Sequence, residues 1–171
     1  QNITPIMVTG DNYHTGKAIA SIVGIDEVFT NCTPNEKSEI ITKTKEKYNI
    51  VAFVGDGVND AVALTVADVG IAIGTGSEVA TSSADIILPN DDLMNIVTLI
   101  SLSRKTINNI KMNLFWAFFY NVIGIFIATG TLYAINIVLN PMIAALAMSL
   151  SSFCVVTNAL RLRHFKPIRK E

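Results

Sequence analysis

The chain has 171 residues and a formal net charge of −1, so its length allows one ordinary domain or a small domain with an appendage. The neutral total hides an asymmetry, because thirteen of the fourteen acidic residues precede Arg104, whereas eight of the thirteen basic residues lie at or after it. The two cysteines, Cys32 and Cys154, lie far apart without a CxxC pair, which leaves a disulfide framework or a zinc site unsupported.

The first half of the chain alternates short apolar runs with segments of helical spacing. Strands are expected at 5–8, 27–30, 50–54, 69–73 and 85–88, and helices at 15–23, 34–48, 59–66 and 77–83. Gly24 is the expected stop of the first helix. Continuous apolar strands between helices are typical of a parallel sheet covered on both faces, so this part is predicted to be an α/β domain.

Two of the expected strands end in Gly-Asp, at Gly10-Asp11 and Gly55-Asp56, and Asp60 follows one helical turn later. Ligands gather at the carboxyl ends of strands in an open parallel sheet. Carboxylates there suit Mg²⁺, which takes hard oxygen ligands together with water and phosphate oxygens. This pattern favours an ion-and-phosphate site.

Two simpler interpretations stay open at this point. A single Gly-Asp at a strand end is usually only a turn, because glycine allows a tight backbone bend. Lys37 lies in a charged helix, where one lysine is normally a solvated surface group.

Four motifs then carry a resemblance. Residues 7–12 (MVTGDN) resemble the TGD motif of P-type ATPases, and residues 55–64 (GDGVNDAVAL) are similar to their GDGxNDxPAL hinge motif. Residues 71–76 and 84–86 continue in the same order and spacing. Val62 stands where that family usually has proline, and the family's DKTGT motif with its phosphorylated aspartate does not occur in the sequence.

The resemblance implies a partial haloacid-dehalogenase-like phosphorylation domain with Mg²⁺ and ATP as cofactors, ATP being bound mainly by a nucleotide domain outside this sequence. The residues it assigns to the phosphoryl group are Thr9, Gly10, Asp11 and Lys37. Those it assigns to Mg²⁺ are Asp56 and Asp60, with Asn59 beside them. Their implied role is charge neutralisation during phosphoryl transfer.

No charged residue or histidine occurs from Met112 to Leu160. These roughly fifty residues are about twice the length of one spanning helix, and Asn136, Asn140 and Pro141 break them, which predicts a two-helix transmembrane hairpin. Basic residues flank both ends, so the positive-inside rule places both ends in the cytoplasm.

Inside the hairpin, Tyr120-Asn121 resembles the YN pair of the copper-transporting branch, and residues 148–152 (MSLSS) resemble its MxxSS motif. The resemblance implies Tyr120, Asn121, Met148 and Ser152 as ligands of transported Cu(I), an ion that suits soft thioether ligands. Helix packing alone is the alternative, since Met, Ser and Asn serve it in membranes. Zinc-type relatives place an acidic residue in the last helix, and this chain has none; Cys154 is interpreted as packing.

The predicted organisation is a phosphorylation-domain segment (1–91), a connecting helix (92–111), a span (112–135), an outer turn (136–140), a second span (141–162) and a basic tail (163–171). The chain is expected to be a fragment of an ATP-driven copper(I) export pump, inactive alone, in a multi-pass cell-membrane protein with its soluble part cytoplasmic. Its expected partners are Cu(I), membrane lipid and the remainder of the pump, without nucleic acid. A membrane-anchored non-catalytic metal-binding or subunit-interaction module is the alternative, and a tethered phosphatase ranks last.

Overall fold

A computed structural model of the chain describes residues 3–56, 59–74, 82–90, 92–130 and 141–167. The chain divides into two compact units, Gln1–Asp92 and Leu93–Glu171. Most of the helix expected at 77–83 and all of the outer turn expected at 136–140 lie outside the described residues.

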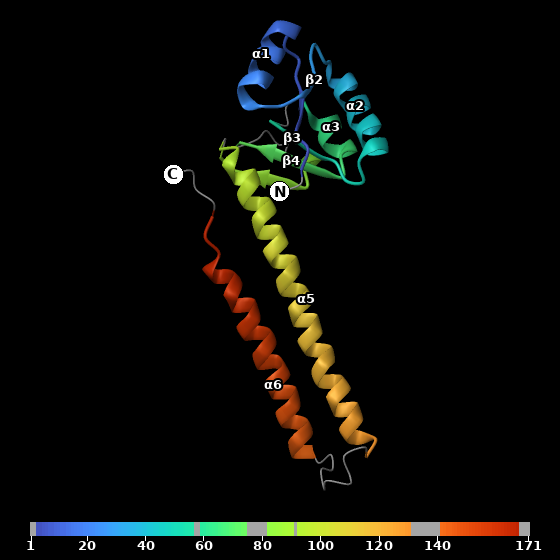
Figure 1. The fold of residues 1–171 in the computed structure, drawn as a ribbon, viewed down its shortest axis with the longest axis vertical. Coiled ribbons are helices and arrows are strands. Elements are labelled where there is room, and N and C mark those ends of the chain that lie inside the picture. Colours follow the sequence, from blue (N-terminus) through green and yellow to red (C-terminus); the bar gives the residue numbers. More distant parts are fainter. Residues whose placement is uncertain (1–2, 57–58, 75–81, 91, 131–140, 168–171) are drawn as a thin grey trace. The chain divides into compact units, whose positions relative to one another are not determined.

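The first unit alternates strands and helices in the predicted order (Figure 1). Its elements are β1 (Ile6–Val8), α1 (Tyr13–Val23), β2 (Glu27–Phe29), α2 (Pro34–Lys47), β3 (Ala52–Gly55), α3 (Ala61–Val66), β4 (Val69–Ile73) and β5 (Ile86–Leu88). The expected strands and helices with described bounds are thus confirmed, with ends that differ by at most two residues.

Side-chain caps explain where the two longer helices of this unit begin. The Asn12 side chain accepts a hydrogen bond from the Thr15 N–H at the start of α1, and Gly24 ends that helix in the left-handed conformation with φ of 71°. Helix α2 begins with a capping box in which Thr33 and Glu36 bond each other's backbone N–H.

The strands form two parallel sheets, β1-β2 and β3-β4-β5, and not the one sheet that the sequence predicted. Ile6 pairs with Glu27 in the first sheet, whereas Ala52 pairs with Val69 and Ile71 with Ile86 in the second. No described strand pairs with both β1 and β3, so no described strand joins the two sheets.

The second sheet carries the small core of the unit. Leu64 of α3 and Ala72 of β4 are buried against each other, and Phe53 packs on them. Two carboxylates secure the amino ends of the strands: Asp68 accepts the Val51 N–H at 2.9 Å, and Asp85 accepts the Gly70 N–H at 2.8 Å.

The second unit is a pair of long helices, α5 (Met94–Ala128) and α6 (Pro141–Leu160), followed by the short 3-10 helix η2 (Arg161–His164). The two long helices run antiparallel, side by side (Figure 1). Both are long and apolar enough to cross a membrane. The structure has no break at residue 112, because one helix covers both the expected connecting helix and the start of the expected first span.

Candidate functional site

The first Gly-Asp motif forms a turn that is tied to the neighbouring strand. The Thr9 hydroxyl donates to Asp11 Oδ2 at 3.0 Å and accepts the Asp11 N–H at 3.1 Å. Beyond the strands, the Asn31 N–H donates to the Asp11 carbonyl and the Cys32 N–H donates to the Thr9 carbonyl. The turn after β1 is thus joined to the segment after β2, with the Asp11 side chain exposed to solvent.

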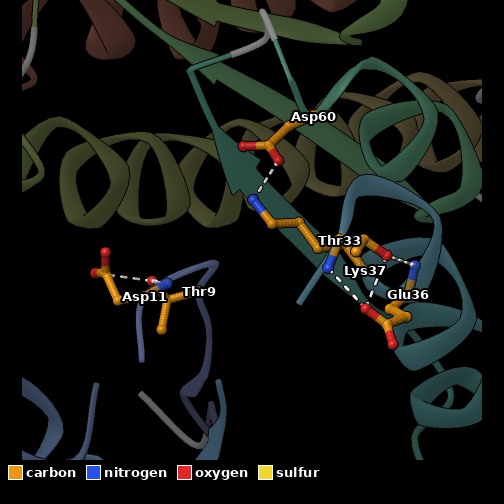
Figure 2. Close-up of polar contacts among 6 residues, drawn as sticks. All are labelled: Thr9, Asp11, Thr33, Glu36, Lys37 and Asp60. Atoms are coloured by element: carbon orange, nitrogen blue, oxygen red, sulfur yellow. Dashed lines mark hydrogen bonds and ion pairs between the residues drawn. The ribbon is translucent and has the colours of Figure 1, made fainter. Parts of the chain in front are cut away.

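Lys37 is directed inward from the first turns of α2. Its Nζ lies 2.6 Å from Asp60 Oδ1, and the two side chains are only 15% and 10% exposed. The interpretation of Lys37 as a solvated surface lysine is therefore wrong. The capping box of Thr33 and Glu36 fixes the turn from which this lysine extends, as Figure 2 shows.

Two contacts hold Asp60, and the space beside it depends on Gly55. The Asp60 carbonyl accepts the Leu64 N–H at 2.8 Å, at the start of α3, and Lys37 engages one carboxylate oxygen. The other oxygen, Oδ2, would lie 2.6 Å from a Cβ atom at position 55, closer than real Cβ contacts allow. Glycine at position 55 is therefore required for Asp60 to occupy this place.

Asp56 and Asn59 lie on the same loop, at the end of β3, and both are exposed. The carboxylates of Asp56 and Asp60, which follow β3, are hard oxygen donors of the kind that Mg²⁺ prefers. Within the described part of the chain, no three His, Cys, Asp or Glu side chains come together as a metal cluster. The type of donor therefore fits Mg²⁺.

The residues expected to contact the phosphoryl group or Mg²⁺ form two groups in Figure 2. Thr9 and Asp11 lie together after β1, and Lys37 pairs with Asp60 between α2 and the loop after β3. The expected convergence thus brings Lys37 and Asp60 together, while the Thr9–Asp11 turn belongs to the other sheet.

Cys32 lies next to these residues but is a poor nucleophile. Burial raises the pKa of its thiol, and the negative charge of Glu36 raises it further. The Glu36 carboxylate has a lowered pKa, mainly because it accepts the Thr33 N–H of the capping box. At neutral pH the thiol is therefore protonated, and Glu36 serves the helix start.

In the second unit, one of the four candidate Cu(I) ligands lies between α5 and α6, and the other three lie outside the contact between these helices. The Tyr120 hydroxyl is 3.4 Å from Cys154 Sγ on α6. Asn121 donates to the Ala117 carbonyl of its own helix at 2.9 Å. Met148, with 74% of its surface exposed, and Ser152 present their side chains on the outside of this helix pair.

Sequence reasoning missed two groups of polar residues that the structure uses. Asp68 and Asp85 bind strand N–H groups, and Asn109 and Asn113 join Asn158 in a hydrogen-bonded cluster between α5 and α6. The four-residue spacing of Asn109 and Asn113 on a largely apolar helix was the available signal for that cluster.

The matching family model covers the first two fifths of the chain, residues 1–68, and is described as a haloacid dehalogenase-like hydrolase. A probable copper-transporting ATPase (PacS) of Synechocystis sp. is 54% identical over 94% of this chain and 22% of its own length. A probable copper-exporting P-type ATPase of Archaeoglobus fulgidus is 51% identical over 94% of this chain and 20% of its own length. The chain thus spans about a fifth of these relatives.

A solved structure covers both units. The crystal structure of a zinc-transporting PIB-type ATPase in its E2.Pi state matches 92% of this chain and 25% of its own, with 35% identity and a TM-score of 0.78. The fold is accordingly a haloacid-dehalogenase-like domain followed by a hairpin of two apolar helices. Over 94% of its length, the chain is similar to ATPases named as copper transporters, one of them a P-type ATPase.

Proposed function

We propose that this chain is part of an ATP-driven pump that exports Cu(I), supplying contacts to Mg²⁺ and the phosphoryl group together with half of an intramembrane Cu(I) site. The observation that carries the proposal is that one chain combines the enclosed Lys37–Asp60 pair with a hairpin free of charge from Met112 to Leu160. The relatives' names, which describe copper transport, support the choice of cargo.

The phosphoryl part of the proposal follows from charge. An amine and several carboxylates near strand ends match the needs of phosphoryl transfer, in which positioning and charge neutralisation do most of the work. Asp56 and Asp60 would hold Mg²⁺, which when bound neutralises phosphoryl oxygens. Lys37 would contact those oxygens, and its pairing with Asp60 keeps the ammonium extended toward the loop after β3. Thr9, Gly10 and Asp11 would line the other side of the phosphoryl group.

The copper part follows from the chemistry of the hairpin. Divalent ions in a membrane call for acidic ligands, whereas Cu(I) is satisfied by soft and neutral ones, and the charge-free run offers only the latter. Met148 supplies a thioether, and Tyr120, Asn121 and Ser152 supply oxygen or nitrogen. Three of these four face outward from the pair of helices, where further spans of a pump would meet them.

The test is metal-stimulated ATP hydrolysis by the full-length pump that contains this sequence. Cu(I) is expected to stimulate hydrolysis and Zn²⁺ is not, and Met148→Ala is expected to remove most of the Cu(I) stimulation. Met142→Ala is the matched control, because Met142 lies on the same helix and is 72% exposed, and it is expected to retain stimulation. Stimulation by Zn²⁺, or an equal effect of both variants, would overturn the copper assignment.

A further inference from the structure

Three asparagines link the two long helices near the end that carries the basic residues. Asn109 Nδ2 donates to the Asn158 carbonyl at 2.7 Å, and Asn158 Nδ2 donates in return to the Asn109 carbonyl at 3.3 Å. Asn158 Nδ2 also donates to Asn113 Oδ1 at 2.8 Å, while Asn113 Nδ2 donates to Asn109 Oδ1 at 3.2 Å. All three side chains are half-buried, and together they form a closed cluster, the amide clamp.

The clamp bonds the last turn of α6 to the other helix. Helix α6 ends at Leu160 and continues directly as the 3-10 helix η2. Asn109 donates from α5 to the Asn158 carbonyl in this last turn. Each amide in the clamp therefore has a specific partner, and sliding one helix along the other would break several hydrogen bonds at once.

The clamp lies in the same interface between α5 and α6 as Tyr120, one of the candidate copper ligands. Asn113 and Tyr120 are seven residues apart on α5, close to two full turns, and so share a face. Asn158 and Cys154 are four residues apart on α6, and Cys154 contacts the Tyr120 hydroxyl. Lys105 lies one turn before Asn109, and its Nζ is 4.9 Å from the centre of the Phe165 ring, a further contact of α5 beyond the clamp. The contacts thus fix one alignment of the helices.

We propose that the amide clamp of Asn109, Asn113 and Asn158 sets the register of α5 against α6 and thereby positions Tyr120 and Asn121 relative to Met148 and Ser152. The three asparagines are positioning residues, since they lie at the basic end of the hairpin and bond each other. This inference rests on the proposed copper site for its functional consequence, while the register itself is a property of the hairpin.

The register is tested on the 171-residue chain in lipid nanodiscs, without metal. Spin labels are attached at Leu114→Cys and Val156→Cys, both exposed positions, in a Cys32→Ser, Cys154→Ser background. Asn158→Leu, which keeps the volume and removes the amide, is expected to broaden or shift the distance distribution, by up to about 5.4 Å for a slip of one helical turn. An unchanged distribution would overturn the clamp.

Asn108→Leu is the matched control for this measurement. Asn108 carries the same amide on α5, next to Asn109 in the chain, but its side chain is exposed and takes no part in the clamp. This variant is expected to keep the distribution of the parent chain. Circular dichroism of each variant verifies that both helices persist, and a register change that Asn108→Leu also produces would overturn the proposal.

The positioning role is tested in the full-length pump. Asn158→Leu is expected to raise the KM for Cu(I) about threefold to tenfold, the range of hydrogen bonds between membrane helices, and to leave the KM for ATP unchanged. A loss of kcat with an unchanged copper KM would indicate a merely structural role and would overturn positioning. If copper does not stimulate the pump at all, the proposed function fails, whereas the spin-label result still decides the clamp.

Discussion

Lys37 Nζ and Asp60 Oδ1 lie 2.6 Å apart, although the two residues are 23 positions apart in the chain. The pair joins α2 to the loop after β3, and both side chains are largely enclosed. A buried charge that loses its partner keeps its desolvation cost, so removing one residue of such a pair strongly destabilises the folded state. This contact therefore couples the stability of the first unit to the geometry of its candidate phosphoryl site.

Replacing Lys37 by methionine is expected to destabilise the region around α3 by about 3 kcal/mol, because Asp60 is left buried and unpaired. The measurement is hydrogen exchange of the Leu64 amide, which bonds the Asp60 carbonyl. Lys43→Met, on an exposed position of the same helix, should change protection by less than about 0.5 kcal/mol. Equal protection in both variants would contradict a structural role for the pair.

Adding a methyl group at Gly55 should displace Asp60, since the new Cβ would lie 2.6 Å from Asp60 Oδ2 and 3.0 Å from Asp60 Cβ. Gly55→Ala is expected to cost about 1–3 kcal/mol, the usual range for forced overpacking. Gly10→Ala is the comparison, because its Cβ would meet only the Cys32 carbonyl oxygen at 3.5 Å, an ordinary contact. Urea unfolding of both variants should rank Gly55→Ala as the less stable.

The stability of the first unit is expected to depend on pH through the Asp68 carboxylate. Its pKa is lowered mainly by the hydrogen bond from Lys45 and also by the one from the Val51 N–H. The folded chain therefore binds fewer protons than the unfolded one, in which the pKa of an aspartate is about 3.9. The stabilisation is complete above that pH and disappears as the pH falls through the lowered value in the folded chain.

Asp68→Asn should accordingly destabilise the first unit at pH 7 and have little effect once Asp68 is protonated in the parent chain. Unfolding curves measured from pH 7 down to about pH 2 test this. Glu46→Gln, at an exposed position of α2, is the control and should give curves parallel to the parent at every pH. A penalty for Asp68→Asn that stays constant with pH would refute the ion-pair explanation.

The isolated 171-residue chain should show no copper-stimulated ATP hydrolysis. Phosphoryl transfer needs an acceptor and a bound nucleotide, and the DKTGT motif that provides the acceptor in this family does not occur in the sequence. Phosphate release by the purified chain in detergent, with and without Cu(I), is the measurement. Any release that rises with Cu(I) would show that the chain carries a complete catalytic site.

Much of the fold followed from local patterns. Residues 69–73 were predicted as a strand and form β4 with the same bounds. A run of five apolar residues between turn-forming neighbours is typical of a buried strand. Gly24 was predicted to end α1, since it accepts the left-handed conformation at low cost. The charge-free run likewise determined two apolar helices, because its length and composition suit a membrane.

Which side chains meet was decided by tertiary structure alone. Spacing places Lys37 on a helix and Asp60 after a strand, but their contact depends on how α2 packs beside α3. The division into two sheets, the contact of Tyr120 with Cys154 and the amide clamp have the same origin. Periodicity determines the conformation of a segment and the face on which a residue lies, whereas partners distant in the chain are selected by the packing of whole elements.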